Sequence, residues 1–145
     1  MFVENLKETL NLGEKLSQKL NPLSIVLLQG PIGAGKTSFV QGIAKGLSIS
    51  EDITSPTFAL SHHYTTGKIP LIHLDLYRLE SITSAKEFFF SEEEEAVQSQ
   101  AILVIEWPEL IEPLIDNFWK IKISYAKNSG RHYEIKDPKN LLTFS

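Results

Sequence analysis

Hydrophobic and polar residues alternate with different periods along the N-terminal part of this chain. In residues 4–20, leucines recur among charged and polar side chains, which predicts an amphipathic helix that ends at Asn21-Pro22. Residues 24–28 form a short apolar, β-branched run that is typical of a buried strand. After Thr37 the apolar positions return to a helical spacing, and Gly46 is the candidate end of this second helix. The pattern predicts a helix, a strand, a loop and a second helix.

A β-hairpin is predicted in the middle of the chain. Residues 57–64 and 69–74 have the composition of strands, and they flank Thr65-Thr66-Gly67-Lys68, a loop of suitable length for a hairpin. Side chains alternate between the two faces of a strand, so His73 and Asp75 are expected to share one face.

The C-terminal half adds further strands. Residues 101–105 are a continuous apolar run, typical of a parallel strand that is buried on both faces. Residues 119–125 and 131–136 predict two more strands, joined by residues 127–130. We therefore expect an α/β fold in which helices flank a mostly parallel central sheet. No internal repeat or long linker divides the chain, so residues 1–145 are expected to form a single domain.

An acidic run and an aromatic run lie between these strands. Ser91 precedes Glu92–Glu95, and we expect it to cap a helix whose capping box Glu94 completes. A metal site or a site for a basic partner is the alternative interpretation of this run. Phe88–Phe90 is expected to bury at least one ring in the core, with an aromatic side chain that faces a partner as the alternative.

The composition is that of an ordinary globular protein, with 42% hydrophobic and 22% charged residues. No apolar run approaches the roughly 18 residues that a membrane span needs, and the N-terminal residues do not resemble a signal peptide. The chain has no cysteine, which excludes disulfides, thiol catalysis and cysteine-bound zinc. We expect a cytoplasmic protein that does not associate with membranes.

The charge balance is acidic, with 14 basic residues against 18 acidic ones and a net charge of −4. Arg78 and Arg131 are the two arginines. A domain that binds nucleic acid by itself normally carries a basic surface, and this composition gives no sign of one. If the protein acts on nucleic acid, we expect a partner to hold it.

The segment Gly30–Thr37 matches the phosphate-binding pattern G-x-x-x-x-G-K-[ST], or P-loop, between the predicted strand and the second helix. Its glycines allow backbone N–H groups to converge on a phosphate at the N-terminus of a helix. Lys36 supplies a charge for the β- and γ-phosphates, and the Thr37 hydroxyl a ligand for Mg²⁺. Without ligand we expect Lys36 to face solvent. The predicted nucleotide-binding residues here are Gly33, Ala34, Gly35, Lys36, Thr37 and Ser38.

A P-loop predicts a fold of the P-loop NTPase type but leaves the class of reaction open. A GTPase normally reads guanine through an N-K-x-D segment, and no segment of this chain fits that pattern. Small-molecule kinases tend to close arginine-bearing lids over the transferred phosphate. With two arginines and no evident lid, a small-molecule phosphotransferase is disfavoured but stays an alternative. A nucleotide-dependent binding module is a further alternative.

Three more motifs follow the P-loop in order: Ser55–Phe58 (S-P-T-F), His73–Arg78 (H-L-D-L-Y-R) and Glu106–Glu109 (E-W-P-E). Together with Gly30–Thr37 they resemble the TsaE (YjeE) family of bacterial ATPases, whose members carry these motifs in this order and at similar spacing. The resemblance covers roughly residues 5–135. Pro31 departs from the family, in which many members carry an acid, and we expect little effect because it precedes the phosphate-binding turn.

The resemblance implies a role in forming threonylcarbamoyladenosine, the modified nucleoside beside the anticodon of tRNAs that read ANN codons. It implies that the protein binds and hydrolyses ATP with Mg²⁺ in support of a complex of TsaD and TsaB. The partner proteins are then expected to hold the tRNA, so that this chain meets tRNA only indirectly.

Two acids are candidates to complete the metal site. Mg²⁺ is usually held by one or two protein oxygens together with phosphates and water. Glu106 follows the buried run of residues 101–105, at the strand end where α/β proteins place ligands, and the family's E-W motif points to the same residue. Asp75 ends another strand as the competing metal-binding or water-positioning acid, with a solvated structural role as its alternative. We expect Mg²⁺ on Thr37 and Glu106, and catalytic roles for Lys36, Asp75 and Glu106.

Residues 54–57 and Trp107 are expected near the nucleotide. Residues 54–57 follow the P-loop helix, where a switch segment that senses the γ-phosphate would lie, and the alternative is a proline turn before a strand. Trp107, next to Glu106, is predicted to pack on the nucleotide or to gate its entry, with a core position as the alternative.

Five further residues are assigned more loosely. Arg131 is predicted to reach phosphate or base, with an ordinary surface arginine as the alternative. Thr9 matches a threonine that family members place near the base. Tyr77 and Arg78 are expected to brace the switch segment or to contact a partner, whereas His73 is expected to be a hydrogen-bonded interior histidine rather than a ligand.

Overall fold

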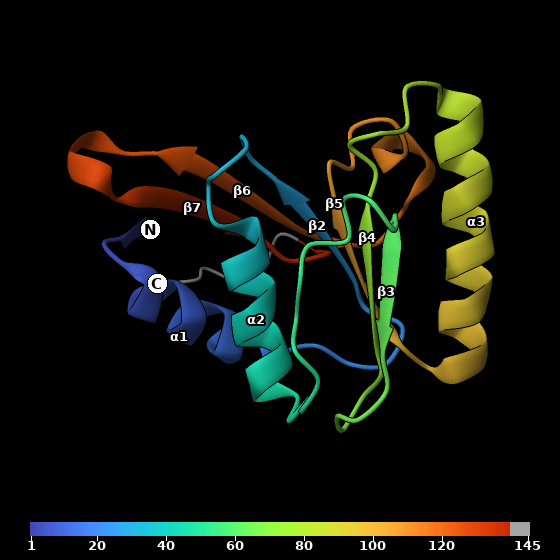
Figure 1. Cartoon of the computed structure of the whole chain (residues 1–145), viewed down its shortest axis with the longest axis horizontal. Coiled ribbons are helices and arrows are strands. Elements are labelled where there is room, and N and C mark those ends of the chain that lie inside the picture. Colours follow the sequence, from blue (N-terminus) through green and yellow to red (C-terminus); the bar gives the residue numbers. More distant parts are fainter. Residues whose placement is uncertain (140–145) are drawn as a thin grey trace.

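The computed structural model describes residues 1–139, which fold into one seven-stranded sheet with helices on both faces (Figure 1). The elements in chain order are β1 (Phe2–Val3), α1 (Leu6–Ser17), β2 (Ile25–Gln29), α2 (Lys36–Gly46), β3 (Ser61–Tyr64), β4 (Leu71–Asp75), α3 (Ile82–Ser99), β5 (Ile102–Glu106), the 3₁₀ turn η1 (Glu112–Leu114), β6 (Trp119–Tyr125), the 3₁₀ turn η2 (Lys127–Ser129) and β7 (Arg131–Lys136). The strand order is β1-β7-β6-β2-β5-β4-β3.

The centre of the sheet is parallel. Strands β6, β2, β5 and β4 run parallel to one another, and antiparallel strands extend the sheet at both edges. This confirms the predicted α/β fold with a mostly parallel central sheet. The predicted hairpin is the β3–β4 pair, in register from Ser61 opposite Leu74 to Tyr64 opposite Leu71. Residues 57–60, predicted as the start of its first strand, form a turn and an irregular segment instead.

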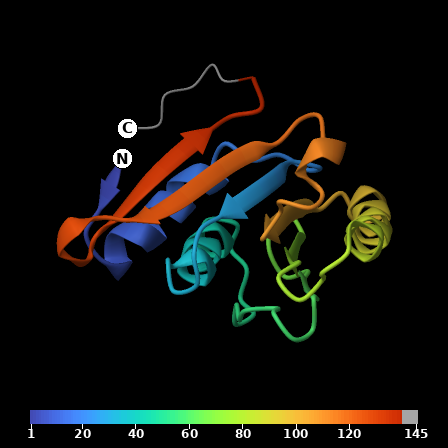
Figure 2. The same cartoon turned by 90° about the horizontal axis from the view of Figure 1, so that it is seen from above.

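The helices divide between the two faces of the sheet. Figure 2 shows α1 and α2 side by side under one face, whereas α3 covers the other face near β4 and β5. The first core contains Leu16, Phe39 and Ile43, and the second is centred on Phe89 of α3. Burial of Phe89 confirms that the Phe88–Phe90 run places a ring in the core. None of the helices in residues 1–139 is long and apolar enough to span a membrane.

The start of α3 differs from the prediction. Ser81, not Ser91, is the N-cap, and its side chain accepts a hydrogen bond from the backbone N–H of Ser84. Ser91 is an exposed residue inside the helix, so the predicted capping box with Glu94 is wrong. The apolar residues before Ser91 belong to the same helix, because Ala85 and Phe89 both pack against the sheet. The Ser-x-x-Glu pattern therefore lies inside a longer helix and does not mark the start of that helix.

The parallel strands bring several motifs to one edge of the molecule. In register, Asp75 at the end of β4 lies beside Glu106 at the end of β5, and Leu28 of β2 lies on the other side of Glu106. The chain leaves β2 at the same edge and enters α2 through the P-loop. Because parallel strands end together, residues far apart in the sequence meet at this edge.

Candidate active site

The P-loop joins β2 to α2 through a turn that uses left-handed backbone. Gly33 has φ +82° and Gly35 has φ +97°, a region that other L-residues rarely adopt. Gly35 is the N-cap of α2, and no side chain caps the first N–H groups of that helix. The first turn of a helix leaves such N–H groups without intrahelical partners, so the start of α2 offers donors to an anion.

Lys36 rests on its own loop. Its Nζ donates hydrogen bonds to the carbonyl oxygens of Gly30 and Pro31 and lies 4.3 Å from the centroid of the Trp107 ring. The side chain is therefore buried, and the expectation that it faces solvent without ligand is wrong. Burial lowers the pKa of Lys36, while the nearby carboxylates of Glu106, Asp75 and Glu109 oppose that shift. The loop's own acceptors and an aromatic ring hold the ammonium in the absence of phosphate.

A cavity of about 300 Å³ opens between the P-loop and the ends of β4 and β5. Lys36, Thr37, Asp75, Glu106 and Trp107 line it, as the sequence predicts for a nucleotide site. The other lining residues are Ile32, Gly33, Gly35, Ser38, Ser55 and Thr57. The structure thus brings Lys36 and both candidate acids to one place.

The two acids have different hydrogen-bond partners. Asp75 accepts from the Thr57 hydroxyl at 2.8 Å through Oδ2 and from the backbone N–H of Tyr77 at 2.9 Å through Oδ1. Glu106 is bonded to the imidazole of His73, with 2.6 Å between Oε2 and Nε2. His73 is fully buried, which confirms that it is a hydrogen-bonded interior histidine. Asp75 therefore anchors a loop, whereas Glu106 is fixed from inside the sheet.

The segment that carries Ser55 and Thr57 forms one wall of the cavity. The two hydroxyls lie 2.8 Å apart, and the Thr57 hydroxyl also donates to the Asp75 carboxylate. Phe58 projects outward with 85% of its surface exposed, and the Arg78 guanidinium lies over its ring at 5.4 Å. The side-chain bond from Thr57 and the backbone bond from the Asp75 N–H to the Leu60 carbonyl thus connect this wall to the end of β4.

Trp107 forms part of another wall in a strained conformation. It has φ +57°, a left-handed value that is costly for a bulky residue. Its ring packs against Tyr77 with centroids 4.8 Å apart, while Lys36 contacts the same ring. Trp107 therefore links the P-loop lysine to an exposed tyrosine. It is half-buried at the cavity rather than a core tryptophan.

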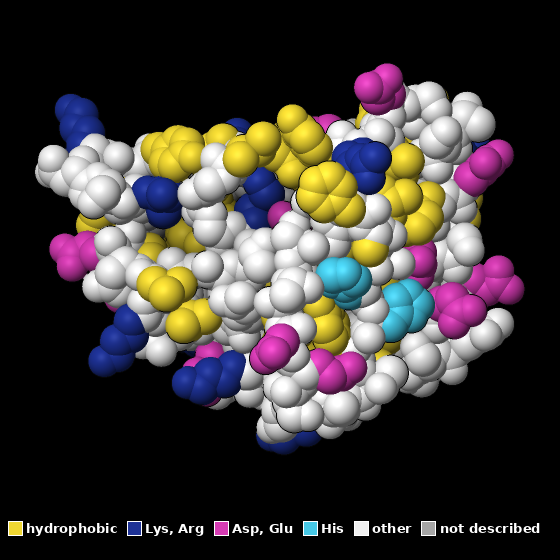
Figure 3. Space-filling view, in the orientation of Figure 1, with side chains coloured by type: hydrophobic (Ala, Val, Ile, Leu, Met, Phe, Trp, Pro, Cys, Tyr) yellow, Lys and Arg dark blue, Asp and Glu magenta, His cyan; other side chains and the backbone are white. Residues whose placement is uncertain are grey.

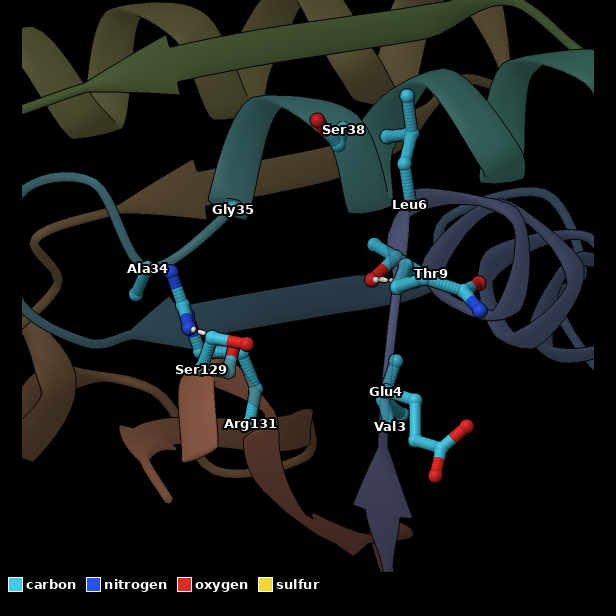
Figure 4. Close-up of a pocket in the computed structure, with 10 residues that line it drawn as sticks. Val3, Glu4, Leu6, Thr9, Ala34, Gly35, Ser38, Ser129 and Arg131 are labelled. Carbon is cyan, nitrogen blue, oxygen red and sulfur yellow. Dashed lines mark hydrogen bonds between the residues drawn. The ribbon is translucent and has the colours of Figure 1, made fainter. Parts of the chain in front are cut away.

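A second cavity of about 160 Å³ lies on the other side of the P-loop, between α1 and β7. Figure 4 shows Thr9 of α1, Ser38 of α2 and Arg131 of β7 around it. Gly35 and Ser38 line both cavities, so the two open on the same helix start. Arg131 does not line the larger cavity; its Nη2 donates to the carbonyl of Gly33 and its Nη1 to the carbonyls of Ser129 and Gly130.

Tyr125 is a site residue that the sequence analysis missed. Its hydroxyl donates to the carbonyl oxygen of Ile32, and the Arg131 guanidinium lies 4.6 Å from its ring. A Cβ on Gly33 would come within 3.2 Å of the same hydroxyl. The β6–β7 hairpin therefore supports the P-loop from one side. The sequence carried no local signal for this contact, because it depends on β6 lying beside β2.

The family assignment rests on the whole chain as well as on this geometry. The TsaE family model, described as threonylcarbamoyl adenosine biosynthesis protein TsaE, matches residues 3–133. The chain belongs to the TsaE family. Its role is in the biosynthesis of threonylcarbamoyladenosine in tRNA.

Relatives of this TsaE-family chain match it over most of their length. The tRNA threonylcarbamoyladenosine biosynthesis protein TsaE of Nostoc sp. (strain PCC 7120) is 42% identical over 137 residues, which are 93% of this chain and 83% of that protein. The TsaE protein of Rickettsia typhi is 37% identical over 95% of this chain and 94% of its own. The crystal structure of Bacillus subtilis YdiB superposes with a TM-score of 0.77 at 27% identity, covering 95% of this chain and 84% of that one.

The TsaE motifs converge in the fold. The P-loop, Ser55–Phe58, the Asp75 region and Glu106-Trp107 all contribute to the larger cavity. Arg78 contacts Phe58 of the segment after the P-loop helix, whereas Tyr77 packs against Trp107, and the expectation that both residues brace that segment or contact a partner stays a prediction. Thr9 and Arg131 lie together at the smaller cavity, where their predicted contacts with base or phosphate stay predictions.

Proposed function

We propose that this chain is a Mg²⁺-dependent ATPase that supports a complex of TsaD and TsaB in forming threonylcarbamoyladenosine in tRNA. The observation that carries the proposal is the convergence of Lys36, Thr37, Asp75 and Glu106 on one cavity at the start of α2. A phosphate-binding turn, a cation and two carboxylates are the groups that ATP hydrolysis requires.

The phosphates of ATP are proposed to bind at the P-loop turn. The backbone N–H groups at the start of α2 face the anion, and Lys36 exchanges the carbonyls of Gly30 and Pro31 for phosphate oxygens. This exchange keeps the ammonium hydrogen-bonded in both states. It also places the positive charge of Lys36 beside the γ-phosphate, where negative charge has to be stabilised during transfer.

The donors at the cavity fit Mg²⁺. Thr37 offers a hydroxyl oxygen and Glu106 a carboxylate oxygen, which are the hard ligands that this ion prefers. Among the described residues no cluster of three or more His, Cys, Asp or Glu side chains is placed to hold a metal by itself. Phosphate and water oxygens would complete the coordination. Bound there, Mg²⁺ supplies positive charge to the β- and γ-phosphate oxygens.

Asp75 is proposed to act through the Ser55–Phe58 segment. It holds Thr57 against the cavity, so the carboxylate sets the position of the wall that would sense the γ-phosphate. Each of its oxygens carries one hydrogen bond to protein and keeps a lone pair for a water molecule. We therefore propose Glu106 as the metal ligand and Asp75 as the residue that positions a water molecule.

The adenosine part of ATP is proposed to lie toward the smaller cavity. Ser38 and Gly35 line both cavities, so a nucleotide whose phosphates occupy the P-loop can extend toward Thr9. Arg131 has a buried Nε without a hydrogen-bond partner within residues 1–139, which leaves a donor for a ligand at this cavity. These observations support contacts of Thr9 and Arg131 with the base or ribose.

Dependence on partners is proposed from the charges at the cavity and the apolar surface around it. Within residues 1–139, Lys36 is the one lysine or arginine that lines the larger cavity. Ile32, Phe58, Tyr77 and Tyr125 are exposed, and hydrophobic side chains gather along the upper edge of the molecule in Figure 3. Such a surface suits a protein partner, and the acidic net charge of −4 leaves tRNA to be held by that partner.

The experiment that tests this function is depletion of the protein in the organism that encodes it, followed by measurement of threonylcarbamoyladenosine in bulk tRNA. We expect the modification to fall and to return with the wild-type chain but not with Glu106→Gln. Purified protein should release phosphate from ATP without a phosphorylated acceptor. A phosphorylated small molecule together with unchanged tRNA modification would favour a phosphotransferase instead.

A further inference from the structure

His73 is a buried polar residue that touches the acid proposed to hold Mg²⁺. It lies on β4 with no exposed surface, and its Nε2 is 2.6 Å from Oε2 of Glu106 on β5. Its other ring nitrogen, Nδ1, is buried and has no hydrogen-bond partner within residues 1–139. The side chain therefore makes one polar contact, and that contact is with Glu106.

This environment selects one tautomer of the imidazole. A neutral histidine carries one ring proton, and the nitrogen that bears it must find an acceptor when it is buried. A proton on Nδ1 would have no acceptor in the described structure, and burying an unpaired N–H group is costly. A proton on Nε2 is donated to the Glu106 carboxylate at hydrogen-bond distance. The geometry therefore places the proton on Nε2.

Donation from His73 fixes one oxygen of Glu106. The carboxylate is almost completely buried, yet Glu106 lines the cavity beside Thr37. Because Oε2 is held from inside the sheet, rotation of the carboxylate is restricted and Oε1 is left for the cavity. Residues that orient metal ligands in this way affect metal binding without contacting the ion.

We propose that His73 is a positioning residue that sets the direction in which Glu106 presents its carboxylate to Mg²⁺. This inference rests on the proposed role of Glu106 as a metal ligand. It differs from a packing role, in which His73 only fills buried space and its loss weakens the fold alone. A packing role predicts loss of stability with unchanged metal affinity in the folded protein.

The test compares His73→Leu with His73→Gln. Leucine fills the site without a donor, whereas the glutamine amide carries N–H donors at the end of its side chain, where it can reach the carboxylate. Binding of Mn²⁺ to the ADP-loaded protein, followed by electron paramagnetic resonance, reports metal affinity without requiring turnover. We expect His73→Leu to weaken Mn²⁺ binding about 10–100-fold, and His73→Gln to recover most of that loss.

A double-mutant cycle separates positioning from packing. In a Glu106→Gln background, His73→Leu should produce little further loss of Mn²⁺ affinity, because the carboxylate that it orients is gone. Full additivity would overturn the proposal. Normal Mn²⁺ affinity in His73→Leu, with weakened affinity in Glu106→Gln, would overturn the role of His73 alone. Normal affinity in Glu106→Gln would overturn the proposed metal site itself, and the role of His73 with it.

A measurement on the unmodified protein covers the case in which His73→Leu does not fold. Long-range ¹H–¹⁵N correlation spectra distinguish the two histidine tautomers. We expect His73 to carry its proton on Nε2, with that signal shifted in Glu106→Gln. A proton on Nδ1 would overturn the proposal whatever the variants do.

Discussion

At the scale of single residues, Lys36 and Trp107 are in direct contact at the proposed nucleotide site. The ammonium of Lys36 is held by two loop carbonyls and the Trp107 ring, and Trp107 in turn packs on exposed Tyr77. Nucleotide binding that draws Lys36 toward phosphate must therefore change the environment of Trp107. The two acids differ in what holds them: Asp75 is hydrogen-bonded to a loop, and Glu106 is hydrogen-bonded to a buried histidine.

Replacing Lys36 with alanine should weaken nucleotide binding while leaving the fold intact. The side chain touches its own loop rather than the apolar core, so a thermal melt should change little. Loss of one hydrogen bond to a charged group should weaken ATP binding about 10–100-fold. Isothermal titration with ATP measures the effect. Lys45→Ala, an exposed lysine of the same helix, is the control, and unchanged ATP affinity in folded Lys36→Ala would contradict the assignment.

Glu106→Gln should reduce ATP hydrolysis by about a hundredfold or more, because it keeps the shape of the side chain and removes the charge that Mg²⁺ requires. Asp75→Asn should reduce hydrolysis less, through the position of Thr57 and of a water molecule. Steady-state phosphate release at saturating Mg²⁺ measures both. Normal hydrolysis by Glu106→Gln together with inactive Asp75→Asn would mean that the two roles are reversed.

Nucleotide binding should change tryptophan fluorescence through Trp107. The chain has two tryptophans, and Trp119 is buried in the core on β6. Titration of Trp119→Phe with ADP should therefore retain the signal seen in the wild type, and Tyr77→Leu should alter its amplitude. Loss of the signal in Trp119→Phe would place Trp107 away from the nucleotide.

At the scale of elements, the P-loop is braced on both sides by segments distant in sequence. The β6–β7 hairpin supports it through Tyr125 and Arg131, and the end of β5 continues into the Glu106–Trp107 wall. On the opposite face, α3 packs over β4 and β5 and so supports the strand ends that carry the acids. The β6–β7 hairpin and α3 therefore both support the residues of the site, the hairpin through the P-loop and α3 through the strands that it covers.

The start of α3 can be tested by capping variants. Ser81→Ala removes the acceptor for the Ser84 N–H and should lower the free energy of unfolding by about 0.5–2 kcal/mol. Ser91→Ala, inside the same helix, should leave it unchanged or slightly raised, because alanine is the better helix former. Urea unfolding of both variants makes the comparison. A larger loss in Ser91→Ala would restore the helix start that the Ser-x-x-Glu pattern predicts.

The elements and the P-loop could be predicted because their signals are local. Periodic apolar positions identified α1, α2, β2 and β5, and the glycine pattern located the phosphate-binding turn. Contacts between distant segments gave no such signal. The buried state of Lys36 depends on Trp107, the Thr57 anchor depends on Asp75, and the support of Ile32 depends on Tyr125. Each of these requires the strand order, which no single segment encodes.

At the scale of the whole molecule, the sheet assembles a cavity at which Lys36 is the one lysine or arginine among the lining residues of the described chain, 1–139. Arg78 and Arg131 lie at its rim, stacked on Phe58 and Tyr125, and neither lines the larger cavity. Rapid phosphoryl transfer usually needs further positive charge at the γ-phosphate, and an arginine supplied by a partner is worth about 10³–10⁵ in rate. The exposed aromatics around the cavity offer a surface on which such a partner would complete the site.

ATP turnover by the purified chain, measured alone, with TsaB and TsaD, and with TsaB, TsaD and tRNA, tests this dependence most directly. We expect slow hydrolysis by the isolated protein and acceleration when the partners are added, with Lys36→Ala inactive in every mixture. Turnover that is already rapid alone and indifferent to every addition would contradict a partner-dependent ATPase.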